Sequence, residues 1–265
     1  MGLRTGIEWT DATWNPVTGC TKVTAGCDHC YAETLARKRL HHIYTRRGPV
    51  VDTAANRADP FAVRLWPDRL GYPRTWAAPR MVFVNSMSDL FHHDVPDDFV
   101  VRVFDVMLRT DRHVYQVLTK RPARAVRFWK KFGDVFGLAT IPAHIWMGTS
   151  VENQDVNYRV RQLADLPARI RFLSCEPLLG RIDLDLGAIH WVIAGGESGP
   201  ERRAMESTWV EMIRDQCVRA RVPFFFKQWG GRTPKAGGRK LGGREWSQLP
   251  DLEPAVAGAH HKSVS

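Results

Sequence analysis

The stretch MVFVNSMSDLFHHDVPDDFVVRVFDVMLRTDRHVYQVLTK, residues 81–120, decides the fold class. It begins and ends with apolar, β-branched runs that are typical of buried parallel strands. Between them, Pro96 opens a segment in which Phe99, Val103 and Met107 recur at every fourth position, as on the buried face of a helix. A strand, a helix and a second strand in this order predict a βαβ unit and an α/β fold.

The same alternation extends along most of the chain. Apolar and aromatic runs, each followed by polar or turn residues, recur at 81–86, 114–120, 145–150, 169–177, 190–198 and 223–228. With a short first strand expected around residues 6–10, six or seven βα units result, which is typical of a barrel or a doubly wound sheet. In either architecture the residues that follow the strands meet at one edge of the sheet, where ligands bind.

Two regions break this alternation. Residues 41–80 contain several prolines and scattered aromatics, and we expect a long, mostly irregular insertion after the first helix. Loops of that length are usually functional or mobile. Residues 232–265 are rich in glycine and basic residues, so we expect a partly disordered C-terminal extension of a single domain at 1–231.

Composition restricts the class of protein. Of the 265 residues, 44% are hydrophobic and 25% are charged, which excludes a disordered or collagen-like chain. A net charge of +10 favours a polyanionic partner such as DNA or RNA, although an ordinary basic protein remains an alternative. No apolar stretch has the length of a membrane span and the N-terminus lacks a signal-peptide core, so we expect a cytoplasmic protein without a membrane partner.

Three of the five cysteines are crowded into one short segment. Cys20, Cys27 and Cys30 form a Cys-x6-Cys-x2-Cys pattern, which in a reducing compartment indicates a metal site rather than disulfides. A zinc site would need a fourth ligand, for which the candidates are His29, His41, His42, His92 and His93. In a four-iron cluster, three cysteines would leave one iron open to a substrate or cofactor. The position of the segment before the first helix of the βα series favours iron–sulfur over zinc.

Further motifs accompany the cysteines. They are NSMSDLFHHDVP (85–96), LTKRPAR (118–124), MGTSVENQ (147–154), LSCEPLLG (173–180), IAGGESG (193–199) and FFKQWG (225–230). Together they resemble a phage-borne family of three-cysteine-motif proteins, over a match from about residue 7 to residue 246. That family is similar to the radical S-adenosylmethionine superfamily. Within the superfamily, a DNA-lesion lyase of the spore photoproduct type is among the nearer analogues of the three-cysteine-motif family.

The resemblance implies a partial or near-complete (β/α) barrel of the radical S-adenosylmethionine type. It implies a 4Fe-4S cluster on Cys20, Cys27 and Cys30, S-adenosylmethionine as cofactor, and an electron donor. The superfamily usually has three residues between the first two cysteines and an aromatic residue before the third, whereas here there are six residues and His29. With the basic charge, we expect an enzyme acting on nucleic acid or a nucleotide. The alternative is a non-catalytic protein that binds nucleic acid or another protein, with a structural metal or a passive cluster.

Residues that follow the expected strands are the candidates for binding the cofactor. They are Asn85, Ser86, Ser88, Thr119, Lys120, Thr149, Ser150, Glu152, Glu176, Gly195, Gly196 and Glu197. Helix capping explains some of these residues and tight turns explain the glycines equally well. Glu176 needs a cationic partner, for which Lys120 and Lys227 are available.

Cys175 is the candidate catalytic residue, because a thiol at the end of a strand could donate a hydrogen atom to a substrate radical or act as a fourth metal ligand. Cys217, by contrast, falls on the apolar face of an expected helix and is interpreted as a core residue. A stripe containing Arg121, Arg124 and Arg127 suits contact with phosphates, and a solvated outer helix face explains it as well.

Overall fold

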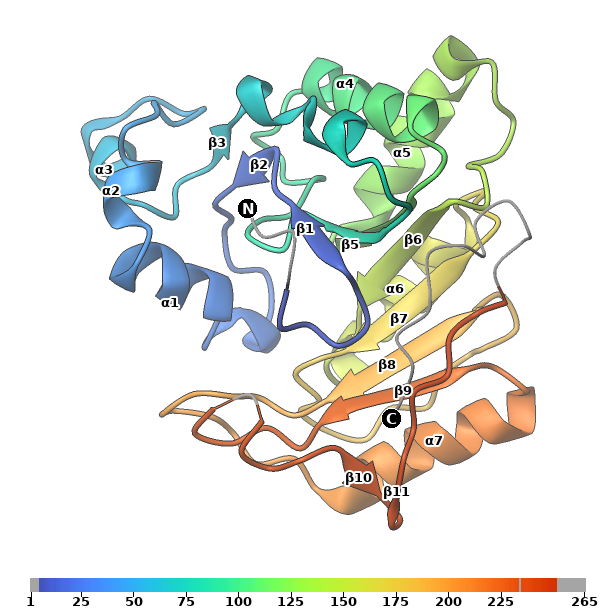
Figure 1. Ribbon diagram of the computed structural model, residues 1–265. Helices are drawn as coiled ribbons and strands as arrows, with labels where there is room; N and C mark the ends of the chain where they lie inside the picture. The colour runs from blue at the N-terminus through green and yellow to red at the C-terminus, as the bar shows by residue number, and fades with distance from the viewer. Residues whose placement is uncertain (1–4, 234, 252–265) are drawn as a thin grey trace.

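Seven parallel strands form one curled sheet in the computed structural model, which describes residues 5–233 and 235–251 (Figure 1). The strands are β1 (Ala12–Trp14), β4 (Met81–Val84), β5 (Val114–Thr119), β6 (Ile145–Ser150), β7 (Arg171–Cys175), β8 (Trp191–Gly195) and β9 (Phe224–Gln228). They lie side by side in chain order, and within the described residues β1 does not pair with β9. The fold is therefore a partial (β/α) barrel, which confirms the predicted class.

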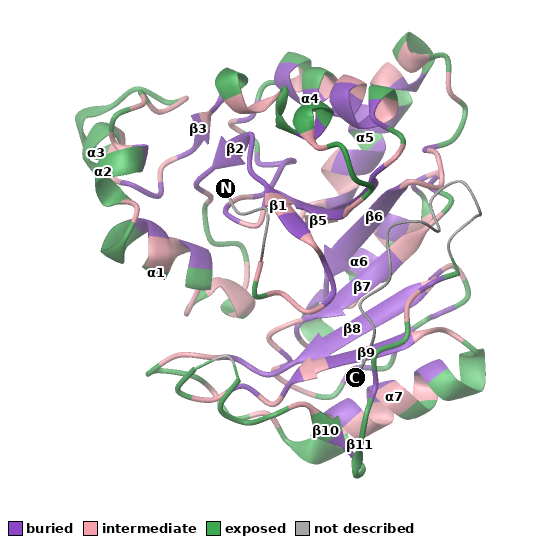
Figure 2. Cartoon of the chain, viewed as in Figure 1, coloured by how far each residue is buried: buried purple, intermediate pink, exposed green. Residues whose placement is uncertain are grey.

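Helices cover the convex face of this sheet. They are α4 (Asp97–Arg109), α5 (Pro122–Phe132), η4 (Gly133–Phe136), η5 (Gln154–Val156), α6 (Tyr158–Ala164) and α7 (Ser207–Ala220). Their apolar residues pack with the outward side chains of the strands in one large core, while their outer faces are exposed (Figure 2). None of the helices in the described residues is both long and apolar enough to cross a membrane.

The first strand lies later than the sequence suggested. The prediction of a strand at residues 6–10 was wrong, since β1 is Ala12–Trp14 and is followed by β2 (Val17–Thr18). Trp9 instead packs against Phe83 and Trp191 beneath the concave face of the sheet. Its carbonyl accepts a hydrogen bond from Nε2 of Gln116 at 3.1 Å. Burial of Trp9 therefore explains the apolar character of this segment.

The insertion at 41–80 is irregular but firmly held. It contains α2 (His41–Tyr44), α3 (Ala54–Ala58), β3 (Arg64–Leu65), η2 (Pro67–Arg69) and η3 (Tyr72–Thr75), of which β3 pairs with β2. The fully buried guanidinium of Arg64 donates to the main-chain carbonyls of Arg47, Asn56, Arg57, Asp59 and Ala62. One side chain thereby satisfies carbonyls that no regular element would satisfy.

The C-terminal segment returns to the edge of the sheet. Its hairpin of β10 (Lys240–Leu241) and β11 (Arg244–Glu245) precedes Trp246, whose carbonyl accepts a hydrogen bond from the Phe226 amide at 2.9 Å. Further along, the Gln248 carbonyl accepts a hydrogen bond from Nε1 of Trp191 at 2.9 Å. The expectation of partial disorder covered residues 232–265, of which 234 and 252–265 lie outside the described residues.

Candidate functional site

The three-cysteine loop lies between β2 and the first long helix. Cys20 follows β2, Cys27 ends η1 (Ala25–Cys27), and Cys30 immediately precedes α1 (Tyr31–Lys38). All three thiols are free and partly exposed. The loop begins at Gly19, which has φ +85° and where a Cβ would lie 2.2 Å from the Ala62 carbonyl oxygen. Only glycine therefore lets the loop lie against the insertion.

The spacing of the three sulfurs indicates which metal they suit. Around one tetrahedral zinc with Zn–S bonds of about 2.3 Å, sulfurs lie about 3.8 Å apart. Among the described residues, a three-member group with ligand atoms all within 4.8 Å of one another occurs at His92, His93 and Asp94, and the cysteines do not form such a group. In an iron–sulfur cluster each thiolate binds a different iron, so wider spacing is required. The arrangement of the three sulfurs is therefore not that of a single-zinc site and is compatible with a cluster that they bind through separate irons.

The surroundings of Cys20 and Cys30 favour the protonated thiol over the thiolate. Burial, with the nearby Asp89 carboxylate, raises the pKa of Cys20 to about 11, although Arg121 opposes this shift. Burial likewise raises the pKa of Cys30. Since a metal binds cysteine as the thiolate, metal binding at these two residues would release protons.

A first ion pair anchors the start of the loop. Asp89, which follows β4, accepts hydrogen bonds from the Lys120 amide at 3.1 Å and from Nη1 of Arg121 at 2.9 Å. Nη2 of Arg121 donates to the Thr21 carbonyl at 3.2 Å, and Nη1 lies 3.7 Å from Sγ of Cys20. The connections after β4 and β5 therefore hold the loop at Cys20.

A second ion pair anchors its middle. The side chain of Glu152 is 1% exposed, and its carboxylate lies 2.6 Å from Nζ of Lys120. It also accepts hydrogen bonds from Nη1 of Arg159 and Oγ1 of Thr24, both at 3.0 Å. Burial alone would raise the pKa of Glu152, but Lys120 and Arg159 outweigh it and hold that pKa below its usual value. A Cβ at Gly26 would lie 2.4 Å from Cγ of Glu152. The glycine lets the loop contact the carboxylate.

A third ion pair anchors its far side. Glu197, two residues after β8, accepts hydrogen bonds from the Arg203 amide at 2.8 Å and from Nη2 of Arg203 at 2.6 Å. The same guanidinium donates to the Ala25 carbonyl at 2.9 Å and lies 3.5 Å from Asp28. Four of the connections that follow strands, those after β4, β5, β6 and β8, thus contact one loop, which places the cysteines at the carboxyl edge of the sheet.

The strands carry polar side chains on the concave face near this edge. Side chains alternate along a strand, so residues two apart share a face. A second apolar cluster contains no residue of the helices α4 to α7 and therefore marks the concave face. It includes Phe172, Ile193 and Phe225, and Leu118 packs against it. The residues that follow them on the same face are Lys120, Ser174, Glu176, Gly195 and Lys227. The concave face is therefore apolar at its floor and polar beside the cysteine loop.

Glu176 has the partner that the sequence suggested. Nζ of Lys227 lies 2.8 Å from its carboxylate, and Oγ of Ser174 donates to it at 3.1 Å. Lys120, the other candidate, pairs with Glu152 instead. A Cβ at Gly195 would lie 3.1 Å from the Glu176 carboxylate, so a larger residue would press on this pair.

The residues after β4 hold the edge together. Asn85 has φ 60°, a conformation that asparagine tolerates, and its side-chain oxygen accepts a hydrogen bond from the Val17 amide at 3.3 Å. Ser88 donates to the Val17 carbonyl at 2.9 Å, and Ser86 exchanges hydrogen bonds with the Asn15 side chain. The Ser86 carbonyl also accepts a hydrogen bond from the Tyr31 hydroxyl. This leaves Nδ2 of Asn85 buried without a partner among the described residues.

Other predicted residues face away from the loop or serve packing. Thr149 is buried and donates to the Thr119 carbonyl at 2.8 Å. A Cβ at Gly196 would lie 2.1 Å from the Trp229 carbonyl oxygen, so this glycine allows close approach of the connections after β8 and β9. Cys175 is fully buried in the large core on the opposite face of β7 from Ser174, and burial raises its pKa. The structure gives Cys175 a packing role, and its catalytic role stays a prediction.

Comparison with known proteins assigns the sequence to a protein family. Over residues 4–250 the sequence matches the family described as "Protein of unknown function (DUF5131)". The chain belongs to this family. No curated protein matches the DUF5131 chain. Among solved structures it is similar to "Spore photoproduct lyase complexed with dinucleoside spore photoproduct", with 12% identity and a TM-score of 0.41. That match covers 76% of this chain and 59% of the other, so the chain spans less than two thirds of that protein.

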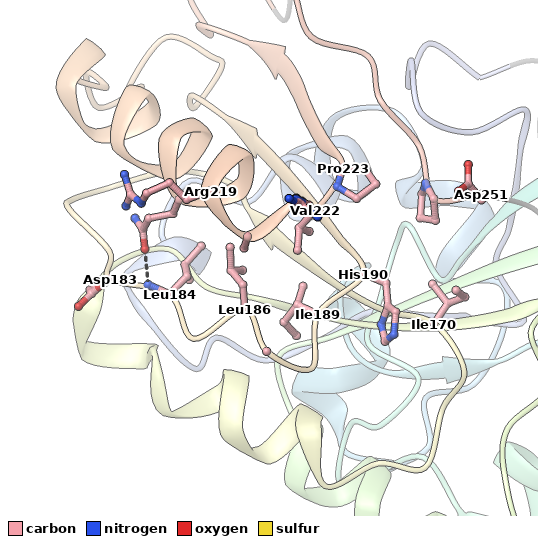
Figure 3. A pocket seen from close by; sticks show the side chains of 15 residues that line it. Ile170, Asp183, Leu184, Leu186, Ile189, His190, Arg219, Val222, Pro223 and Asp251 are labelled. Carbon is pink, nitrogen blue, oxygen red and sulfur yellow. Dashed lines mark hydrogen bonds between the residues drawn. The ribbon is translucent and has the colours of Figure 1, made fainter.

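A pocket of about 830 Å³ lies elsewhere, at the amino ends of the last strands (Figure 3). It is lined by Ile170 and His190 before β7 and β8, by the connection at 183–189, and by Arg219 at the end of α7. No cysteine and no predicted cofactor-binding residue lines it. The predicted site and this pocket occupy opposite ends of the sheet.

Some functional contacts had little signal in the sequence. Thr24 and Gly26 of the cysteine loop meet Glu152 and Arg159, although Thr24 and Glu152 are 128 positions apart in the chain. The glycine between the first two cysteines was the one available signal, because a glycine in a ligand loop often marks a close approach. The partners themselves follow only from the folding of the loop onto the sheet.

Proposed function

We propose that this DUF5131 chain is an iron–sulfur enzyme of the radical S-adenosylmethionine type. Cys20, Cys27 and Cys30 would hold a 4Fe-4S cluster with one iron left for the cofactor. The supporting observation is a set of three thiols, spaced more widely than one zinc requires, in the first βα loop of a parallel partial barrel. When bound, such a group supplies the electron for reductive cleavage of S-adenosylmethionine.

The side chains of the carboxyl edge have two roles in this proposal. Three carboxylates hold the cysteine loop through their cationic partners. Asp89 pairs with Arg121, Glu152 with Lys120 and Glu197 with Arg203. Residues on the concave face bind the polar part of the cofactor or substrate. They are Lys120, Ser174, Glu176, Gly195 and Lys227, with Ser150, which shares a face of β6 with Trp146 of the apolar floor. The apolar floor beneath them, with Phe172 and Trp191 fully buried, excludes water from below.

The substrate proposed is a nucleic acid or a nucleotide. Lys38, Arg39 and Arg46 are exposed and form no ion pair within the described part of the chain. They lie at the end of α1 and just after α2, directly beyond the cysteine loop, and no acidic residue occurs between Glu33 and Asp52. With a net charge of +10, this segment suits contact with phosphates.

Metal analysis of protein purified without oxygen tests the proposal. We expect about four irons and about four sulfides per chain, no zinc, and an electron paramagnetic resonance signal that shifts when S-adenosylmethionine is added. Cys20→Ser, Cys27→Ser and Cys30→Ser should each lose the cluster, whereas the control Cys217→Ala should keep it. Zinc in place of iron, or a signal unaffected by the cofactor, would contradict the enzyme and favour a non-catalytic binding protein.

A further inference from the structure

Arg121 is the charged side chain closest to a cysteine sulfur in the hydrogen-bond network of the loop. Its Nη1 lies 3.7 Å from Sγ of Cys20 and 2.9 Å from the Asp89 carboxylate. Its Nη2 donates to both the carbonyl and Oγ1 of Thr21 at 3.2 Å. The side chain is only 14% exposed, so its position is set by these contacts rather than by solvent.

The surroundings of Arg121 hold it in this place. Its own amide donates to Oγ1 of Thr119 at 2.9 Å, immediately before Pro122 begins α5. Oγ1 of Thr21 also pairs with Nε2 of the fully buried His92 at 2.8 Å. The guanidinium therefore cannot turn away from Cys20 without breaking several hydrogen bonds.

The three cysteines differ in this respect. Sγ of Cys30 faces main-chain amides of α1, including that of Glu33. Within the described residues, no side-chain cation donates a hydrogen bond to Cys27 or Cys30. Lys120 acts on Cys30 through its charge, but among the described residues Cys20 is the cysteine that accepts a hydrogen bond from a cationic side chain. That side chain, Arg121, is the ion-pair partner of the buried Asp89.

We propose that Arg121 is a positioning residue that raises the reduction potential of the metal centre by holding a positive charge and a hydrogen bond against the sulfur of Cys20. This inference rests on the proposed function. Reduction adds negative charge, and hydrogen bonds and positive charge near the ligand sulfurs favour the reduced form. Asp89 fixes the guanidinium of Arg121 and offsets part of its charge. The ion pair of Arg121 and Asp89 together therefore determines how far the reduction potential is raised.

A redox titration followed by electron paramagnetic resonance tests this role. Arg121→Gln should still bind iron and sulfide, because all three cysteines remain, but its reduction equilibrium constant should fall about tenfold, which is about 59 mV for a one-electron couple. Arg121→Lys, which keeps the charge and loses the planar fork, should show a smaller shift in the same direction.

Arg124→Gln is the matched control. Arg124 lies one turn along α5, is similarly buried, and donates to the carbonyls of His92 and Val95 and to Asp97, with no hydrogen bond to a cysteine. Its loss changes the net charge equally and should leave the potential unchanged.

The outcomes separate this inference from the function on which it rests. A loaded Arg121→Gln variant with the wild-type potential, or an equal shift in Arg124→Gln, would overturn the role of Arg121. If Arg121→Gln takes up no iron, Arg121→Lys decides: a lowered potential supports the proposal and an unchanged one overturns it. A wild-type chain that holds no iron–sulfur cluster contradicts the proposed function and this inference together.

Discussion

Replacing Gly26 with alanine should dislodge the cysteine loop from the sheet. A Cβ at this position would lie 2.4 Å from both Cγ and Oε1 of Glu152. Ordinary contact between such atoms is about 3.5 Å or more, so something must move by about 1 Å. The carboxylate is 1% exposed and is held by Lys120, Arg159 and Thr24. Either these contacts weaken or the loop retreats.

The size of the effect follows from those contacts. A hydrogen bond to a charged group contributes about 1.5 to 3 kcal/mol, and overpacking a closed site costs about 1 to 3 kcal/mol. We expect Gly26→Ala to lower the free energy of unfolding by about 2 kcal/mol. Because Cys27 is the next residue, iron uptake on reconstitution should fall as well.

Urea unfolding of the apo-protein and iron analysis after reconstitution measure these two effects. Gly48→Ala is the control, since a Cβ there meets nothing within 4 Å. The double variant with Glu152→Ala tests the cause, because without the Glu152 side chain Gly26→Ala should cost little more. Wild-type stability and iron content in Gly26→Ala, or the same cost in the Glu152→Ala background, would refute the reasoning.

Three further predictions address other parts of the molecule. Burial lowers the pKa of His92 to about 4, against about 6.5 in an unfolded chain, so the unfolded state binds the proton first. Stability should therefore be complete above about pH 6.5 and decline towards pH 4, a decline that His92→Gln should reduce in urea titrations at several pH values. Cys175→Ala should lower the free energy of unfolding by about 1 kcal/mol and leave iron content and the response to S-adenosylmethionine intact; loss of either would instead support a role in chemistry. The triple change Lys38→Glu, Arg39→Glu and Arg46→Glu should weaken binding of a fluorescent DNA oligonucleotide and flatten its salt dependence. The equally exposed control set Arg127→Glu, Lys130→Glu and Arg161→Glu should do neither, and equal losses in both sets would show a non-specific charge effect.

The sequence by itself determined the βα alternation and supplied the cysteines that are the candidate metal ligands. The apolar runs at 81–84 and 145–150 form buried strands. A strand that is buried on both faces needs a nearly continuous apolar run, and such a run can be recognised in the local sequence. The Cys-x6-Cys-x2-Cys pattern is equally local. The three-residue β1 escaped prediction because so short a strand has almost no pattern of its own, while Trp9 nearby is apolar for a different reason.

Only the tertiary structure decided what each polar residue at the carboxyl edge does. Thr119 and Lys120 are adjacent in the sequence, but strand geometry places Lys120 on the concave face and Thr119 on the opposite face. Glu176 and Cys175 are separated between the two faces in the same way. The partners of the charged residues also depend on folding, since Lys120 meets Glu152 rather than Glu176. Local periodicity determines which segments are buried, but ion pairs and close approaches join residues far apart in the chain, and their geometry exists only once the loop has packed onto the sheet.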